Sequence, residues 1–186
     1  GRIHRLEADL GFQIAPDPLH RVFNRELGGG CLLDVGVYPL SLAIMLLGVP
    51  QSVRGRATIG ATGVDECNTM ELDYDNGVKA MLSASIREKT PQHVHVWGEV
   101  GELHMHGHWW KGGPFSVKTS AGTREFDIPL MGSGYHYEAD DVSRCIFAGA
   151  TESGIMPLSQ SVNVLKIADS LRSQWGLRYP GETGMT

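Results

Sequence analysis

The sequence has few cysteines, no surplus of basic residues and no long apolar run. Its three cysteines, Cys31, Cys67 and Cys145, are widely spaced, which suits neither a disulfide framework nor a paired metal motif and is typical of a reducing compartment. Sixteen Lys and Arg against 21 Asp and Glu give a net charge of −5, so no basic excess favours nucleic acid. The strongest apolar stretch, 42–49, contains Gly48 and is too short to span a bilayer. We therefore expect a cytoplasmic protein that binds neither nucleic acid nor a membrane.

A dinucleotide-binding glycine loop is also missing. No G-x-G-x-x-G motif occurs, although 24 of the 186 residues are glycine. The chain begins at Gly1, without an initiator methionine or a signal peptide, and we expect it to be part of a longer protein. Hydrophobic residues make up 41% of it, which is enough for one core, and the length suits a single domain over 1–186.

Short segments of alternating hydrophobicity predict strands. The first covers 2–12, and turn residues such as those at 75–77 separate the later ones. The later predicted strands cover 52–59, 67–74, 78–86, 94–97, 103–108, 115–119 and 124–128. Their connections are too short for parallel crossovers, so antiparallel pairing is favoured.

Three segments have apolar residues at helical spacing and are each followed by glycine. The first, 31–47, comes directly after three glycines, and we expect Pro39 to kink it because proline removes one backbone donor. The other two cover 137–148 and 158–175. The order of elements predicts an α+β domain, in which helices cover one face of an open, mostly antiparallel sheet.

Two residues on the first predicted helix are candidates for chemistry. Asp34 and Tyr38 lie four residues apart, so their side chains share a face. A buried carboxylate is costly unless paired, so Asp34 should have a partner or face a cleft, and a phenol beside it can move a proton at a substrate oxygen. The alternative is that Asp34 caps a helix turn and Tyr38 packs with a satisfied hydroxyl. Arg21 and Arg25 precede the glycines and are either anion-binding groups or ordinary solvated side chains.

Histidines at period-2 spacing offer a competing site. His93 and His95 form one set, and His104, His106 and His108 form another on a predicted strand. Each set lies on one face of its strand, so two or three imidazoles could converge on a metal ion. The alternative is a polar sheet face exposed to solvent or to a partner subunit.

Two segments carry a family resemblance. The segment 21–47, RVFNRELGGGCLLDVGVYPLSLAIMLL, resembles the second-domain signature of the glucose–fructose oxidoreductase, inositol dehydrogenase and MocA (GFO/IDH/MocA) family. Its form GGG-x-LLD-x-G-x-YP is most similar to the branch that contains dimeric dihydrodiol dehydrogenase. Tyr137-Glu138-Ala139 and the segment 146–180 are similar to the closing helices of the family. The resemblance covers almost the whole chain and implies that 1–186 is the open-faced C-terminal domain.

The resemblance implies hydride transfer between NAD or NADP and a sugar, polyol or diol. It also implies an N-terminal Rossmann domain that holds the cofactor and carries the catalytic lysine, so that this chain alone is inactive and Lys89 is not that lysine. Asp34 corresponds to the aspartate at the substrate and the catalytic lysine, and Tyr38 corresponds to the tyrosine that gives or takes the proton. Arg21 lies where relatives have an arginine near the cleft, and we expect it to contact substrate.

Family members commonly use the open sheet face for subunit contacts. The resemblance therefore implies a homo-oligomer, with the period-2 histidines and Trp109-Trp110 at the interface. Two alternatives stay open. One is a scaffold that keeps the dimerising sheet without chemistry, and the other is a metal-binding β-sheet protein that uses the histidines.

Overall fold

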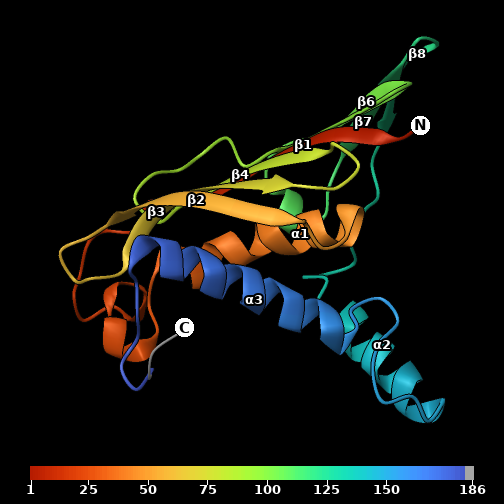
Figure 1. Ribbon diagram of the computed structural model, residues 1–186. Helices are drawn as coiled ribbons and strands as arrows, with labels where there is room; N and C mark the ends of the chain where they lie inside the picture. The colour runs from red at the N-terminus through yellow and green to blue at the C-terminus, as the bar shows by residue number, and fades with distance from the viewer. Residues whose placement is uncertain (183–186) are drawn as a thin grey trace.

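Figure 1 shows the computed structural model of the chain, in which residues 1–182 are described. Eight strands form one sheet in the order β2-β3-β4-β1-β5-β6-β7-β8. The strands are β1 (Ile3–Gly11), β2 (Ser52–Ile59), β3 (Asp65–Asp73), β4 (Lys79–Ser85), β5 (Val94–Gly98), β6 (Gly101–Met105), β7 (Phe115–Thr119) and β8 (Gly122–Phe126). The helices are α1 (Val37–Leu47), α2 (His136–Phe147) and α3 (Leu158–Trp175), with short turns at Arg21–Phe23, Arg25–Leu27, Leu32–Gly36 and Trp109–Lys111. The predicted open, mostly antiparallel sheet with helices is confirmed.

The first strand lies in the middle of the sheet. β1 pairs in parallel with β4 and antiparallel with β5, while the other pairs are antiparallel. The single parallel pair is possible because the connection from β1 to β4 contains α1, β2 and β3, which is long enough for a crossover. β1 thereby joins two groups of strands that are each connected by short turns.

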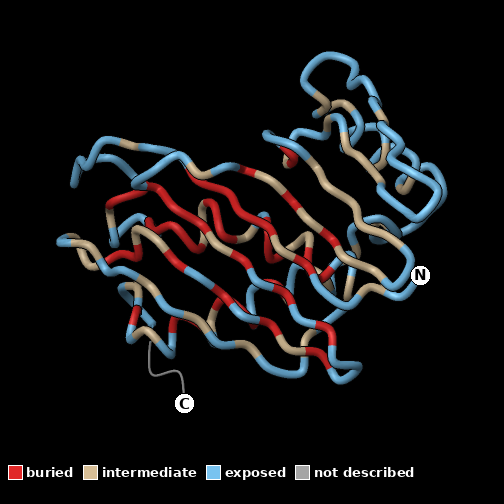
Figure 2. Tube along the Cα trace, turned by 90° about the horizontal axis from the view of Figure 1, so that it is seen from above, coloured by how far each residue is buried: buried red, intermediate tan, exposed pale blue. Residues whose placement is uncertain are grey.

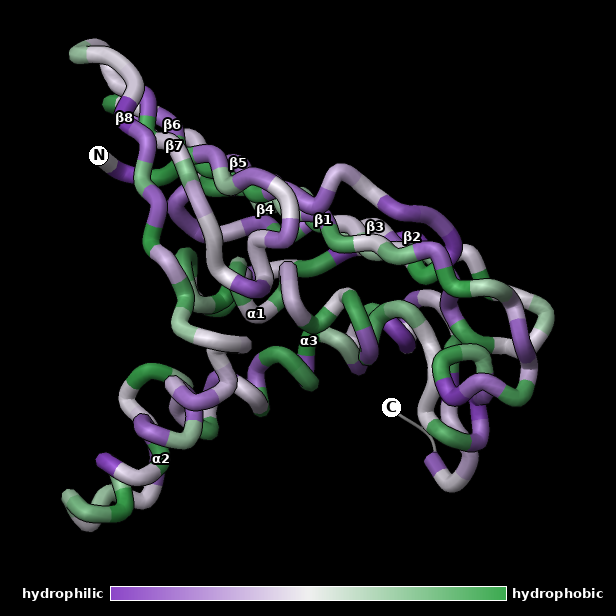
Figure 3. Tube along the Cα trace, turned by 180° about the vertical axis from the view of Figure 1, so that it is seen from behind, coloured by the Kyte–Doolittle hydropathy of each residue, from purple (hydrophilic) through white to green (hydrophobic). Residues whose placement is uncertain are grey.

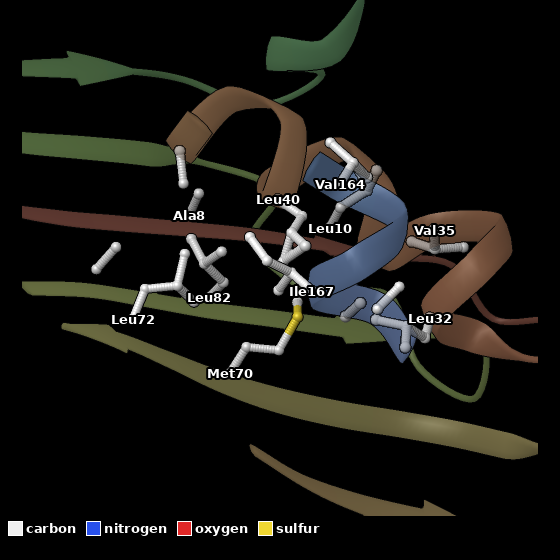
Figure 4. Packing of buried hydrophobic residues seen from close by; sticks show 14 of the residues in the cluster. Ala8, Leu10, Leu32, Val35, Leu40, Met70, Leu72, Leu82, Val164 and Ile167 are labelled. Atoms are coloured by element: carbon white, nitrogen blue, oxygen red, sulfur yellow. The ribbon is translucent and has the colours of Figure 1, made fainter. Parts of the chain in front are cut away.

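The core lies between the sheet and the two helices beneath it. Alternation along β1 turns Leu6, Ala8 and Leu10 toward the helices, where each is at most 4% exposed. Figure 4 shows Leu40 of α1 and Ile167 of α3 packed near these strands. Figure 2 shows that the buried residues follow the central strands, while the outer loops and the far end of the sheet are exposed. The centre of the sheet is therefore the rigid base of the domain.

The first predicted helix has two parts. Leu32–Gly36 forms a π-helical turn, and the regular helix α1 begins only at Val37. Pro39 stands in the first turn of α1, directly after the π-turn, and the predicted kink at Pro39 stays a prediction. Gly48 ends α1 with φ +81°, and its N–H donates to the carbonyl of Ile44 at 2.9 Å.

Within residues 1–182, one helical stretch is long and apolar enough to cross a membrane by length and composition. It covers Arg25–Leu47, which is longer than the apolar run 42–49 considered from the sequence. Half of its most apolar window is buried inside the domain, as in an ordinary core helix.

The helix α2 extends away from the sheet, beyond the end of α3 (Figure 1). Figure 3 shows that hydrophobic residues alternate with hydrophilic ones along it. Val142, Ile146 and Phe147 are 56%, 69% and 91% exposed. The apolar side of α2 is therefore largely open to solvent in the part of the chain that is described.

Candidate functional site

The glycines before α1 allow the chain to turn back tightly on itself. A Cβ on Gly29 would lie 2.6 Å from the carbonyl oxygen of Val22, so no larger residue fits there. Gly30 has φ +129°, and a Cβ on it would lie 2.5 Å from Oδ1 of Asp65. The run of glycines therefore brings the segment that contains Arg21 against the start of the π-turn.

A buried carboxylate fixes that start. Oδ2 of Asp65 accepts hydrogen bonds from the backbone N–H of Leu32 at 2.8 Å and from Nδ2 of Asn68 at 2.9 Å. Asp65 is fully buried, and burial raises the pKa of its carboxyl group, an effect that the two hydrogen bonds oppose. Asp65 thus caps the free backbone donors at the beginning of the helical segment. Sequence reasoning missed this residue, because nothing near 65 in the sequence points to Leu32.

Asp34 is paired with Arg21. Nη1 of Arg21 lies 2.6 Å from Oδ1 of Asp34, and the two side chains are 65% and 26% exposed. The prediction that Asp34 has a partner is confirmed. The pair leaves part of the carboxylate open to solvent, so Asp34 can still contact a bound molecule.

Tyr38 lines a cleft of about 760 Å³, which is within the usual size of small-molecule sites. Its side chain is half-exposed, and so it is not the packed tyrosine of the alternative interpretation. The residues that line this cleft are Tyr38, Trp110, Lys111, Gly112, Leu130, Gly132, Ser133, Gly134, Tyr135, Tyr137 and Glu138. Asp34 is not among them, so the structure places Tyr38 in this cleft without Asp34.

Sequence reasoning gave no site role to the part of the cleft wall at the beginning of α2. Tyr135 and Tyr137 stand at the beginning of α2, and the hydroxyl of Tyr137 accepts from the N–H of Met131 at 3.3 Å. Lys111 and Glu138 add one charge of each sign. Aromatic faces together with hydroxyl and charged groups suit a ring-shaped ligand that carries hydroxyls. The nearest turn signals in the sequence are Gly132 and Gly134, which precede Tyr135.

The histidines lie on the sheet face that the helices leave open. His95 and His104 stand directly opposite each other on β5 and β6, with ring centroids 5.2 Å apart and nearly parallel planes. The ring of His104 also lies 4.3 Å from that of His106. β6 ends at Met105, so the prediction that His106 and His108 lie on a strand is wrong. The pairing of β5 with β6 ends at Val94 and Met105, so β5 has no residue that pairs with those after Met105.

These imidazoles stack on one another and bind neighbouring carboxylates. Nδ1 of His93 lies 2.9 Å from Oδ1 of Asp9, and Nε2 of His95 lies 2.9 Å from Oε2 of Glu102. Burial and the adjacent imidazoles lower the pKa of His104. Among residues 1–182, no three His, Cys, Asp or Glu side chains are arranged to hold a metal ion.

The two tryptophans have different surroundings. Trp109 is 7% exposed, and its Nε1 donates to the carbonyl of Asp9 at 2.8 Å. It belongs to the core, so the expectation that both tryptophans lie at a subunit interface is wrong for Trp109. Trp110 lines the Tyr38 cleft and meets Phe12 edge to face, with centroids 5.3 Å apart.

The three cysteines are free, as their spacing predicted. No disulfide joins them, and Cys31 is buried in the core, where burial raises the pKa of its thiol. None of the three lines the Tyr38 cleft. The cysteines therefore add no nucleophile to this cleft.

Comparison with known proteins gives a consistent result. The model of the GFO/IDH/MocA C-terminal domain matches residues 1–104. Trans-1,2-dihydrobenzene-1,2-diol dehydrogenase of Xenopus tropicalis is 33% identical over 190 residues, which are 97% of this chain and 56% of that protein. The human protein of the same name is 27% identical, with the same coverage. The chain thus spans about half the length of the curated relatives it matches.

Solved structures share the fold. An aldose-aldose oxidoreductase of Caulobacter crescentus, in complex with glycerol, matches 95% of this chain and 55% of its own, with a TM-score of 0.81 and 21% identity. A levoglucosan dehydrogenase in complex with NADH and levoglucosan matches 95% of this chain and 57% of its own, with a TM-score of 0.80 and 18% identity. At these identities, the similarity establishes the fold alone.

Proposed function

The chain belongs to the GFO/IDH/MocA family, and from this premise we propose that it is the substrate-binding half of an NAD(P)-dependent oxidoreductase. The reaction is hydride transfer between a nicotinamide and a carbon of a sugar, polyol or diol. The observation that carries this proposal is the Tyr38 phenol on the wall of a cleft of about 760 Å³. The names of the relatives, a diol dehydrogenase and an aldose oxidoreductase, support the same substrate class.

Tyr38 is the residue we assign to proton transfer. When bound, a nicotinamide supplies the acceptor or donor of the hydride. As the C–H bond of a carbinol breaks, its hydroxyl must lose a proton, and the half-exposed Tyr38 hydroxyl can relay it, accepting the proton on its oxygen while its own O–H proton passes to a neighbouring base. In the reverse direction, Tyr38 returns the proton to the carbonyl oxygen. The aromatic walls around it hold the ring of the substrate in place.

Arg21 and Asp34 have a supporting role in this proposal. The guanidinium holds the Asp34 carboxylate in one orientation at 2.6 Å, and the exposed part of the carboxylate is open to a group from outside this chain, such as the catalytic base. The charge of Asp34 favours the protonated form of a nearby base, such as a lysine. Asp34 and Tyr38 are the proposed catalytic pair, and Arg21 is the proposed substrate-side partner.

The dinucleotide is held mainly by a further domain in this proposal. This chain has no G-x-G-x-x-G motif, and its residues offer the cleft wall rather than a phosphate loop. The exposed apolar side of α2 supports the presence of another folded unit beside the cleft, since α2 begins with cleft residues. Either NAD or NADP fits the proposal, because similar structures contain NADH or NADP.

We also propose a cytoplasmic homodimer that forms through the open sheet face. Three free cysteines support a reducing compartment. The open face carries alternating charges, such as Arg5 and Glu7, with the stacked histidines beside them. Such a polar face, left uncovered by helices, suits a subunit contact with many hydrogen bonds.

The test is Tyr38→Phe in the full-length protein, with NAD(P)H followed during oxidation of aldoses, polyols and cyclic diols. We expect kcat to fall by about 10²- to 10⁴-fold, because proton transfer loses its group. Tyr74→Phe is the control, since the Tyr74 hydroxyl is buried away from the cleft and has no hydrogen-bond partner within residues 1–182. Unchanged kcat in Tyr38→Phe would show that another group moves the proton. Absence of turnover in the wild-type protein would favour the scaffold interpretation.

A further inference from the structure

The chain after α3 runs back beside the turns at 21–27 (Figure 1). The hydroxyl of Tyr179 donates a hydrogen bond to the carbonyl oxygen of Gly29 at 2.6 Å. One residue earlier, the carbonyl oxygen of Arg178 accepts from Nε of Arg25 at 2.6 Å. These bonds join residues that are 150 and 153 positions apart, so they tie the end of the described chain to the start of the candidate site.

The tail 177–182 is itself anchored on α3. Arg172 is 4% exposed and donates from Nη1 and Nη2 to the two carboxylate oxygens of Glu182, at 3.0 and 2.8 Å. Oε2 of Glu182 also accepts from the backbone N–H of Tyr179 at 2.9 Å. The Arg172 guanidinium lies over the ring of Tyr179, 4.9 Å from its centre. Arg172 thus holds both the backbone and the ring of Tyr179 in place.

A single peptide group joins this tail to the Arg21 segment. Its carbonyl oxygen, on Gly29, accepts from Tyr179, and its N–H, on Gly30, donates to the carbonyl of Val22 at 2.8 Å. A peptide group is planar, so the bond on one side fixes the direction of the other. Burial raises the pKa of Tyr179 to about 12, so its hydroxyl stays protonated and remains a donor at neutral pH.

We propose that Tyr179 is a positioning residue of the candidate site, which acts through the Gly29–Gly30 peptide on the Arg21–Asp34 pair. The inference rests on the proposed function and adds a residue that does not line the cleft. Without the Tyr179 hydroxyl, the peptide keeps only its N–H bond, and glycine on both sides lets it rotate. The Arg21 segment then loses its fixed distance from Asp34, and the carboxylate loses one orientation.

Tyr179→Phe in the full-length protein removes the hydroxyl and keeps the ring. We expect kcat/KM to fall about tenfold for the aldose, polyol or diol that is oxidised fastest. The acidic limb of kcat/KM reports the catalytic base, whose protonated form Asp34 favours, so displacing that charge should move the limb about half a pH unit lower. Asp34→Asn should move the limb in the same direction. Tyr74→Phe is the matched control and should change neither value, because its buried hydroxyl has no hydrogen-bond partner within residues 1–182. Loss of folded protein alone would leave the limb where it is.

A double-mutant cycle tests the route through Arg21. We expect Tyr179→Phe to lower kcat/KM less than about twofold in an Arg21→Met background, because the pair it positions is already broken. An equal fall in both backgrounds, or an unmoved pH limb, would overturn the proposal. If Tyr179→Phe does not fold, Glu182→Gln takes its place, since it weakens the anchor of the tail and keeps the hydroxyl. We expect a fall of about threefold there, again with the limb at lower pH.

Hydrogen exchange separates this inference from the proposed function. Mass spectrometry of peptides that cover 24–34 reports the N–H of Gly30, which the carbonyl of Val22 protects. We expect exchange in Tyr179→Phe to be at least about tenfold faster than in wild type, and exchange in Tyr74→Phe to be unchanged. Unchanged exchange in Tyr179→Phe would overturn the inference in an enzyme that is fully active. A wild-type protein without turnover would overturn the oxidoreductase function, and the catalytic role of Tyr179 with it.

Discussion

The guanidinium of Arg21 and the carboxylate of Asp34 are 2.6 Å apart, although three consecutive glycines separate them in the chain. The contact exists because the backbone at Gly29 runs against the carbonyl oxygens of the Arg21 segment. Both partners are partly in solvent, so the pair adds at most about 1 kcal/mol to stability. Its main effect is to hold one orientation of the Asp34 carboxylate beside the start of α1.

Arg21→Met tests this orienting role. In the full-length enzyme we expect kcat/KM to fall by about tenfold or more, because Asp34 loses its fixed orientation, while the free energy of unfolding changes by less than about 1 kcal/mol. Arg56→Met on the edge strand β2 is the control and should keep wild-type kinetics. Steady-state kinetics and urea denaturation are the measurements. A large loss of stability with unchanged kinetics would show that the pair is structural only.

Gly30→Ala should destabilise the domain by about 3 kcal/mol. The alanine must keep a φ of +129°, and its Cβ would collide with the Asp65 carboxylate that caps the π-turn. Gly28→Ala provides the matched control, since its φ is also positive, at +71°, but nothing lies within 4 Å of the added carbon. There we expect a loss of about 1 kcal/mol. If urea denaturation showed the same loss of unfolding free energy in both variants, the close approach of residue 30 to Asp65 would not contribute to the effect.

Trp109→Phe should cost about 1 kcal/mol more than Trp175→Phe. The first exchange removes a buried hydrogen bond to the carbonyl of Asp9. The indole N–H of Trp175 is buried without a partner in residues 1–182, so the second exchange removes ring volume but no hydrogen bond. Thermal and urea unfolding of both variants give the comparison. If Trp175→Phe were the more damaging, the Trp109 bond would not contribute to stability.

His104 on the open face should make the domain less stable in acid. The pKa of His104 is lowered from its usual 6.5 by burial and by its imidazole neighbours, so the folded protein binds fewer protons than the unfolded chain below that pH. This shift costs no stability well above pH 6.5, where the imidazole is neutral in both states, and it destabilises the folded protein increasingly as the pH falls below 6.5. His104→Gln should therefore reduce the loss of unfolding free energy between about pH 7.5 and 5.5. His4→Gln is the control and should show the wild-type loss of unfolding free energy over this pH range. The same loss in His104→Gln would contradict the assignment of the acid effect to His104.

The periodicity of hydrophobic residues in the sequence was sufficient to predict most helices and strands of the fold. The bounds of β2, β7 and α3 coincide with the segments predicted at 52–59, 115–119 and 158–175. These segments have clear alternation or helical spacing, and turns or glycine stop them. Features that depend on contacts with residues distant in the chain were harder to predict from the sequence. The strand predicted over 103–108 stops at Met105, because both neighbouring strands end their pairing there.

The candidate site was predictable in part. Asp34 and Arg21 were identified from the sequence, and the structure joins them, but their catalytic and substrate roles stay predictions. The cleft wall formed by Lys111, Tyr135 and Glu138 could not be predicted, because it combines a loop after β6 with the start of α2. Asp65 was missed for the same reason, since its capping role depends on a contact with Leu32, 33 residues earlier in the chain.

The central position of β1 also determines when the domain can fold. β1 is synthesised before both of its partners, since β4 and β5 end only at Ser85 and Gly98. The β2–β3–β4 hairpins and the β5–β8 meander can each form from neighbouring residues, and both must then pair with a strand that was made before either group. Closing such long loops is slow, so β1 stays without a partner on the nascent chain until β4 or β5 has been made.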